Sequence, residues 1–183
     1  MYETERLILR NWEAKDTASF IKMNQDLKVM EFFPGPYSSE ETIQSINNFK
    51  RSIEEHGYGM FACELKEDGQ FIGFVGLMYR DFEASFTPCV EIGWRIAHEY
   101  WGKGLAVEAA CKCLDIGFNE FNLGEIVSFT ASVNKRSERV MQKLGMRRDP
   151  THDFYHPKLE SQHPLAWHIL YRLSKSDFVK NQA

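Results

Sequence analysis

The chain has 183 residues, of which 43% are hydrophobic and 26% are charged, and its formal net charge is −4. These values are ordinary for a globular protein, and the length suits one domain with a substantial core. Nonspecific nucleic-acid binding needs a basic footprint. The acidic balance therefore argues against a nucleic-acid partner.

No run of the sequence approaches the ~18 consecutive apolar residues of a membrane span. The segment Met1–Glu5 is acidic where a secretory leader would be basic. The four cysteines do not look like a disulfide framework at this size, and Cys111 and Cys113 point to different faces of a predicted helix. We therefore expect a cytoplasmic protein without a membrane partner.

The first half of the chain predicts a strand, two helices and a hairpin. Ser38 or Ser39 is expected to cap the second helix, because acidic residues follow in its first turn. In chain order, the elements are a strand over Leu7–Trp12, a helix over Ala14–Leu27, an aromatic loop over Phe32–Tyr37, the capped helix, and strands over Gly59–Leu65 and Gln70–Tyr79 around the turn Lys66–Gly69.

The second half predicts an alternation of strands and helices. After a loop over Arg80–Pro88 come a strand over Val90–Ile96, a helix over Val107–Phe118, a strand over Glu125–Val133, a helix from Asn134 to Leu144 and a strand over Ala166–Leu173. This succession of strands and helices predicts an α+β protein, although periodicity alone does not give the pairing of the strands.

Four histidines crowd the C-terminal third of the chain: His152, His156, His163 and His168. His152 and His156 have helical i,i+4 spacing, but the neighbouring prolines disfavour a helix there. We therefore expect no zinc or other metal site. His168 is expected to be a packed residue of the last strand.

Two glycines, Gly102 and Gly104, lie between a predicted strand and a predicted helix. Glycines let the backbone turn sharply, and the bare N–H groups and positive dipole end of the helix suit an anion such as pyrophosphate. The segment is neither a Walker A loop, because Leu105 follows Lys103-Gly104, nor a dinucleotide fingerprint, because the third glycine is absent. Alone, it is also compatible with an ordinary tight turn.

A second motif starts at Asn134 and ends at Gly145. Asn134 is expected to cap the helix, Val140 and Leu144 lie one turn apart on its buried face, and Gly145 supplies the left-handed stop. A capped amphipathic helix without a ligand fits the same residues.

Together the two motifs resemble the cofactor-binding segments of GCN5-related N-acetyltransferases (GNAT). Gly104 and Ala106 fill the last two places of the family pattern Gln/Arg-x-x-Gly-x-Gly/Ala, and Asn134 with Ser137 resembles the second segment. Trp101 stands in the first place of the pattern, where the family has Gln or Arg, and a tryptophan at this place resembles the RimJ/RimL branch.

This resemblance extends from about Thr4 to Asp177 and implies a GNAT acyl-CoA N-acyltransferase fold. In that fold a central mixed, mostly antiparallel sheet is flanked by helices. It also implies a single N-acetyltransferase domain over residues 1–183, with a core of about 4–177, working as a monomer or homodimer.

The resemblance implies acetyl-CoA as cosubstrate, with no metal, and a primary amine as acceptor, either a protein N-terminus or a small molecule. The amine would attack the thioester directly. The residues that would bind the cofactor are Trp94, Arg95, Ile96, Trp101, Gly102, Lys103, Gly104, Leu105, Ala106, Asn134 and Ser137.

Glu91 is the only carboxylate on the predicted cofactor strand, so it is the candidate general base, acting through a water. Glu91 alternates with Gly93 and Arg95 on one face. A simple ion pair between Glu91 and Arg95 explains the same residue without catalysis.

The candidate general acid is Ser137. Many acetyltransferases have a tyrosine seven residues after the asparagine, but Met141 stands there and cannot donate a proton. The remaining donor is Ser137, as in RimL-like proteins, although a serine in the first turn of a helix can also serve only in capping.

The acceptor site is predicted from aromatic residues in two loops: Phe32, Phe33, Tyr37, Phe82 and Phe86. Such loops also plug cores as often as they line clefts. The alternative to an enzyme is an acetyl-CoA-binding module that has lost catalysis and works as a sensor or partner.

Overall fold

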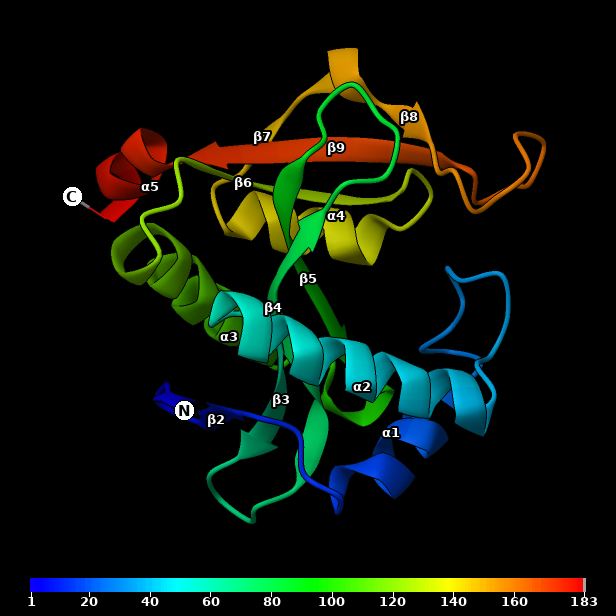
Figure 1. Cartoon of the computed structure of the whole chain (residues 1–183), viewed down its shortest axis with the longest axis vertical. Helices are drawn as coiled ribbons and strands as arrows, with labels where there is room; N and C mark the ends of the chain where they lie inside the picture. The colour runs from blue at the N-terminus through cyan, green and yellow to red at the C-terminus, as the bar shows by residue number, and fades with distance from the viewer. Residues whose placement is uncertain (183) are drawn as a thin grey trace. The chain divides into compact units, whose positions relative to one another are not determined.

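The computed structural model describes residues 1–182, and its elements are labelled in Figure 1. The backbone contacts divide the chain into two compact units. The first unit comprises Met1–Met78 and Gly93–Cys113, and the second comprises Tyr79–Ile92 and the residues from Leu114 onward. Strands β4 (Phe71–Arg80) and β5 (Cys89–Ile96) contribute residues to both units.

The first unit is built on antiparallel strands. The strands β1 (Tyr2–Glu3), β2 (Leu7–Arg10), β3 (Met60–Leu65) and β4 pair successively in that order. The end of β5 lies beside β4, and only glycine fits at the crossing point. A Cβ at Gly73, whose φ is +140°, would lie 2.1 Å from the carbonyl oxygen of Arg95.

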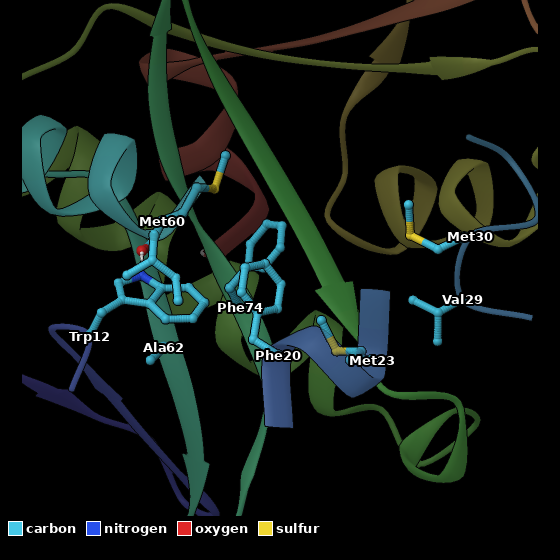
Figure 2. Packing of buried hydrophobic residues seen from close by; sticks show 9 residues of the cluster. Trp12, Phe20, Met23, Val29, Met30, Met60, Ala62 and Phe74 are labelled. Carbon is cyan, nitrogen blue, oxygen red and sulfur yellow. Dashed lines mark hydrogen bonds between the residues drawn. The ribbon is translucent and has the colours of Figure 1, made fainter. Parts of the chain in front are cut away.

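Two helices, α1 (Asp16–Gln25) and α2 (Ser39–His56), pack against each other in this unit. Of the two serines predicted to cap α2, Ser38 does so, in a capping box with Glu41, and Gly57 ends the helix in the left-handed conformation. Figure 2 shows buried hydrophobic residues of the unit, in which the tilted rings of Trp12 and Phe20 pack against each other near Phe74.

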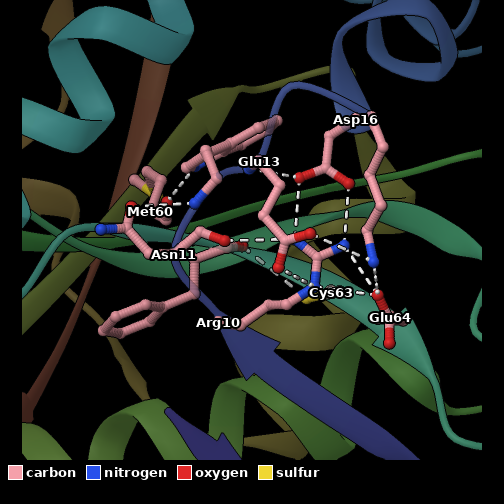
Figure 3. Close-up of polar contacts among 10 residues, drawn as sticks. Arg10, Asn11, Glu13, Asp16, Met60, Cys63 and Glu64 are labelled. Carbon is pink, nitrogen blue, oxygen red and sulfur yellow. Dashed lines mark hydrogen bonds and ion pairs between the residues drawn. The ribbon is translucent and has the colours of Figure 1, made fainter.

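Figure 3 shows a buried ionic cluster that joins β2 to α1 and β3. The guanidinium of Arg10 donates two hydrogen bonds of 2.8 Å to Asp16 and lies 2.7 Å from Glu64. Arg10 is 6% exposed and Asp16 is fully buried. Each charge in this cluster has an opposite partner, which a buried charge needs.

In the second unit, the strands gather around β9 (Trp167–Ser174). The antiparallel partners of β9 are β6 (Glu125–Ala131), β7 (Arg147–Arg148) and β8 (Phe154–Tyr155). The start of β5 pairs with β6 in parallel, at Glu91 and Val127. The helices of this unit include α4 (Lys135–Lys143) and α5 (Lys175–Gln182).

The predicted order of the main elements is confirmed, with changes at their ends. The helix predicted over Val107–Phe118 begins earlier, as α3 (Leu105–Asp115), and finishes as a π-helical turn, η2 (Ile116–Glu120). The short strands β1, β7 and β8, the 3-10 turns η1 (His98–Tyr100) and η3 (Pro150–His152), and α5 are additions to the prediction. None of the helices within residues 1–182 is both long enough and apolar enough to span a membrane.

Candidate active site

The two-glycine turn leads directly into α3, in the first unit. Gly102 and Gly104 have φ values of +76° and +79°, the left-handed region that favours glycine. A Cβ at Gly102 would meet no atom within 4 Å, and one at Gly104 would meet only the end of the Arg6 side chain, at 3.6 Å. The turn therefore has open space beside its backbone.

The amides at the start of α3 are available to a ligand. The amide of Glu108 donates to the carbonyl of Gly104 at 3.0 Å, which closes the first turn of the helix. The amides before Glu108 in this turn have no intrahelical acceptor. With the helix dipole they form a site that fits a phosphate or pyrophosphate group.

Arg6, which the sequence analysis did not select, holds this turn in place. Its Nη1 donates to the carbonyl of Lys103 at 3.0 Å, and its guanidinium lies 2.6 Å from Glu108. Thr4 also donates to Glu108, at 2.5 Å. These partners are about one hundred positions away in the chain, so local sequence patterns gave no signal of the contact.

Trp101 connects the turn to the end of β5. Its indole Nε1 donates to the carbonyl of Ile96 at 2.7 Å, and its ring packs against the core of the first unit. In this structure the indole N–H of Trp101 is thus bound to the strand. Trp101 orients the turn, while the side chain of Lys103 is exposed and lies 5.2 Å from the ring centroid of Tyr100.

The predicted ion pair between Glu91 and Arg95 is wrong. Glu91, 8% exposed, accepts a hydrogen bond of 2.6 Å from Nε of Arg80 within the second unit. In the first unit Nη1 of Arg95 donates to Oδ1 of Asn24, also at 2.6 Å. Each side chain has its partner on another element, which the spacing along one strand does not reveal.

The Asn134 motif forms as predicted, in the second unit. Oδ1 of Asn134 accepts from the amide of Ser137 at 3.1 Å and so caps α4. Nδ2 of Asn134 donates to Oγ of Ser137 at 3.1 Å and to Oγ1 of Thr130 at 3.0 Å. Gly145 has a φ of +73°, and Met141 is 1% exposed.

The predicted acceptor residues fall in different units. In the first unit, Phe33 and Tyr37 are half-buried against the core, and their rings face the guanidinium of Arg95. Phe32 lies in the same loop and is half-buried. Phe82 and Phe86 belong to the second unit, where they pack in an aromatic cluster.

This aromatic cluster also contains two histidines that were not selected for the site. Phe82 lies 5.7 Å from Phe154 and 5.9 Å from His156, and the rings of His156 and His168 are 4.9 Å apart. Burial, together with the neighbouring His168, lowers the pKa of His156 to about 4. The expectation that His168 packs on the last strand is confirmed.

The family match and the fold identify the class of protein. Residues 6–147 match the family described as Acetyltransferase (GNAT) domain, so the chain belongs to the GNAT family, and its mixed, mostly antiparallel sheet flanked by helices is the GNAT fold. The chain is an N-acetyltransferase, and enzymes of this family use acetyl-CoA.

Individual proteins are similar to this chain over most of its length. The protein YkkB of Bacillus subtilis is 34% identical over 149 residues, which are 81% of this chain and 86% of YkkB. The N-acetyltransferase YnaD of the same organism is 34% identical over 147 residues, 80% of this chain and 82% of YnaD. A GNAT-family acetyltransferase structure from Bacillus anthracis has a TM-score of 0.76 at 29% identity, covering 95% of this chain and 98% of that one.

Proposed function

We propose that the chain transfers an acetyl group from acetyl-CoA to a primary amine, by direct attack of the amine on the thioester. The amine is that of a protein N-terminus or of a small molecule. The observation that carries this proposal is the Gly102–Gly104 turn, whose backbone is open where it meets the unpaired amides of α3. We further propose that the chain belongs to the RimJ/RimL-like branch and forms one functional domain over residues 1–183.

In this proposal acetyl-CoA supplies the acyl group as an activated thioester. The amides from Gly102 to Ala106 would bind its pyrophosphate, and the backbone of Trp94, Arg95 and Ile96 would line its pantetheine arm. The carbonyl of Ile96 already accepts from Trp101. Asn134, which caps α4 by accepting from the amide of Ser137, would donate a hydrogen bond to the pantetheine arm.

Glu91 is the proposed general base. Its carboxylate is nearly buried, and Arg80 fixes it through Oε2. A carboxylate held in this way can accept the proton of the amine through one water. The same ion pair would also serve a purely structural role, so the two roles must be separated by experiment.

Ser137 is the proposed general acid. Its Oγ accepts the hydrogen bond from Nδ2 of Asn134, so its own hydrogen is directed elsewhere and can be donated to the leaving thiolate. Met141, buried on the same helix, cannot take this role.

Two groups of acceptors follow from the similarities. Spermidine N(1)-acetyltransferase of Escherichia coli is 26% identical over 157 residues, 80% of this chain. A spermidine N-acetyltransferase from Vibrio cholerae, solved with CoA and spermine, has the same fold, with a TM-score of 0.73 at 21% identity. These relatives support a small amine, whereas the RimJ/RimL resemblance supports a protein N-terminus.

An acetyl-CoA-binding sensor is the second candidate function, and the buried Met141 favours it. For either function we propose a cytoplasmic location, because all four cysteines are free thiols, and a monomer or homodimer.

The test is release of free thiol from acetyl-CoA by the purified chain. Spermidine, small amino acids and peptides with a free N-terminus serve as acceptors, and mass spectrometry identifies the products. An enzyme gives acetylated amine in step with thiol release. Calorimetric binding of acetyl-CoA without any acetylated amine would contradict the enzyme and support the sensor.

A further inference from the structure

Arg95 extends from the end of β5 into a pocket of uncharged side chains in the first unit. Its Nη1 donates to Oδ1 of Asn24, and its guanidinium carbon lies 4.1 Å from the ring centroid of Phe33 and 5.1 Å from that of Tyr37. Phe74 lies on a third side, at 5.5 Å. The guanidinium thus meets an amide and aromatic faces.

Among residues 1–182 no carboxylate forms an ion pair with this cation, whose side-chain hydrogen bond goes to the amide of Asn24. Asp26, the acid nearest to Asn24 along the chain, pairs with His98 at 2.5 Å. The N–H at Nε of Arg95 is buried and donates to no hydrogen-bond acceptor. An arginine remains charged in proteins, and a charge removed from water without a counterion is costly.

The surroundings of Arg95 hold the guanidinium in a fixed orientation. Nδ2 of Asn24 donates to Oγ1 of Thr42 at 3.0 Å, so Oδ1 of Asn24 faces Arg95. Asn24 and Thr42 are both fully buried. The carbonyl of Asn24 also accepts from the amide of Tyr37 at 3.1 Å, which anchors the aromatic loop. The Arg95 residue is only partly buried, which leaves part of it open to solvent.

We propose that Arg95 binds a carboxylate carried by the amine acceptor. A guanidinium fork matches the two oxygens of a carboxylate, and an anionic group here would neutralise the cation that the protein leaves unpaired. A polyamine has no such group, and its charge would be repelled by Arg95. This inference rests on the proposed function and narrows it to amines that also carry a carboxylate.

The experiment compares acceptors that differ only in that carboxylate. β-Alanine is paired with β-alaninamide, and glycylglycine with glycylglycinamide, so that a small amine and a peptide are both tested. Spermidine completes the set. With the wild type we expect kcat/KM to be at least about 10-fold higher for the acid of a pair than for its amide, as a charged hydrogen bond would give.

Two variants assign the preference to the side chain of Arg95. Arg95→Met removes the charge, and Arg95→Lys keeps the charge but loses the fork. We expect Arg95→Met to abolish the preference for the acid by raising its KM, and Arg95→Lys to keep part of it. Arg147→Met is the matched control, since that arginine is exposed in the second unit, and it should keep the full preference.

A binding measurement keeps the result independent of turnover. Calorimetry with β-alanine is performed in the presence of CoA, which cannot transfer an acyl group, and acetyl-CoA affinity is measured on the same proteins. If amines are acetylated but acids and amides react equally, the inference fails and the proposed function stands. If no amine is acetylated but β-alanine binds in an Arg95-dependent way, the proposed function fails and the carboxylate site stands. A loss of acetyl-CoA affinity alone in Arg95→Met would overturn the inference, because Arg95 would then serve the cofactor.

Discussion

Arg10 is a buried arginine and Arg95 a partly buried arginine of the first unit, and they differ in their partners. Arg10 lies between two carboxylates, Asp16 and Glu64, and also donates to the carbonyl of Asn11. Arg95 meets one amide oxygen and three aromatic rings. A charge whose partners all come from the protein stabilises the fold, whereas a charge left without a counterion is available to a ligand.

The same substitution at the two arginines should therefore have opposite consequences. Arg10→Met leaves Asp16 and Glu64 buried without a cation, and we expect it to lower the free energy of unfolding by about 3–5 kcal/mol. Denaturant titration measures this loss. Lys66→Met, which breaks an ion pair with the exposed Glu3, is the control and should leave stability nearly unchanged.

The acid dependence of this loss follows from Asp16. Burial raises the pKa of Asp16, but the hydrogen bonds from Arg10 and from the Glu13 amide, together with the positive charges of Arg10 and Lys15, outweigh burial, and the net pKa is lowered. The pair therefore stabilises the protein fully above the unfolded pKa of about 3.9 and loses that contribution as pH falls through the lower folded pKa. The stability gap between wild type and Arg10→Met should narrow in acid, and a gap that widens would contradict the assignment.

The turn before α3 offers a second anion site. The variant Gly104→Glu tests whether this site binds a different ligand from the site at Arg95. A glutamate at this position would occupy the phosphate site and repel the pyrophosphate. We expect acetyl-CoA affinity to fall by at least about 100-fold, or 2.8 kcal/mol, while β-alanine binding is retained.

Gly69→Glu is the matched control, because Gly69 also has a positive φ, +70°, and lies in a hairpin with open space around it. Circular dichroism establishes that both variants fold. Unchanged acetyl-CoA affinity in a folded Gly104→Glu protein would remove the turn from the cofactor site.

Glu91 resembles Arg10 in having a protein partner, so its catalytic role needs a separate test. Glu91→Gln keeps a hydrogen-bond acceptor for Arg80 but cannot take a proton. If Glu91 is the base, turnover should fall by about 10-fold to 100-fold at neutral pH and recover partly at higher pH, where more amine is free. Glu125→Gln, at an exposed pair with Arg172, should keep normal turnover. A loss of stability at constant turnover would make Glu91 structural.

A smaller effect is expected for Ser137→Ala, which removes the proposed proton donor. The helix cap is retained, because Asn134 accepts from the amide of Ser137 rather than from its hydroxyl. Turnover should fall by about 10-fold with little change in acetyl-CoA affinity, and Ser137→Thr should restore part of it. Wild-type turnover in Ser137→Ala would assign the proton to water or substrate.

The smallest effect is expected on the stability of Arg95→Met. Removing a buried cation that has no carboxylate partner relieves a desolvation cost, so the free energy of unfolding should stay within about 1 kcal/mol of the wild type or rise. Denaturant titration beside Arg10→Met compares the two sites directly. A loss as large as that of Arg10→Met would show that Arg95 is a structural residue too.

The sequence was sufficient for features that depend on neighbouring residues. The serine cap of α2, the Asn134 cap of α4 and the glycine turn at Gly102 each depend on residues within a few positions, and the structure contains all three. The order of the main strands and helices follows from the same local patterns.

Features set by distant residues could not be predicted. The partners Arg95 and Asn24 are 71 positions apart, and Arg6 and Lys103 are 97 apart. Glu91 finds Arg80 on the preceding strand rather than Arg95 on its own, because the register of two strands is a tertiary property. The strands β7 and β8, which both pair with β9, have two residues each and are too short to show a periodic pattern.

The most direct test of the central claim is the initial rate of thiol release from acetyl-CoA by the wild type with β-alanine and β-alaninamide in parallel. Both amines are held at the same concentration of free base, so that only the carboxylate differs. We expect an acetylated product with both amines and a rate at least about 10-fold higher with β-alanine. Equal rates, or a faster reaction with the amide, would contradict it.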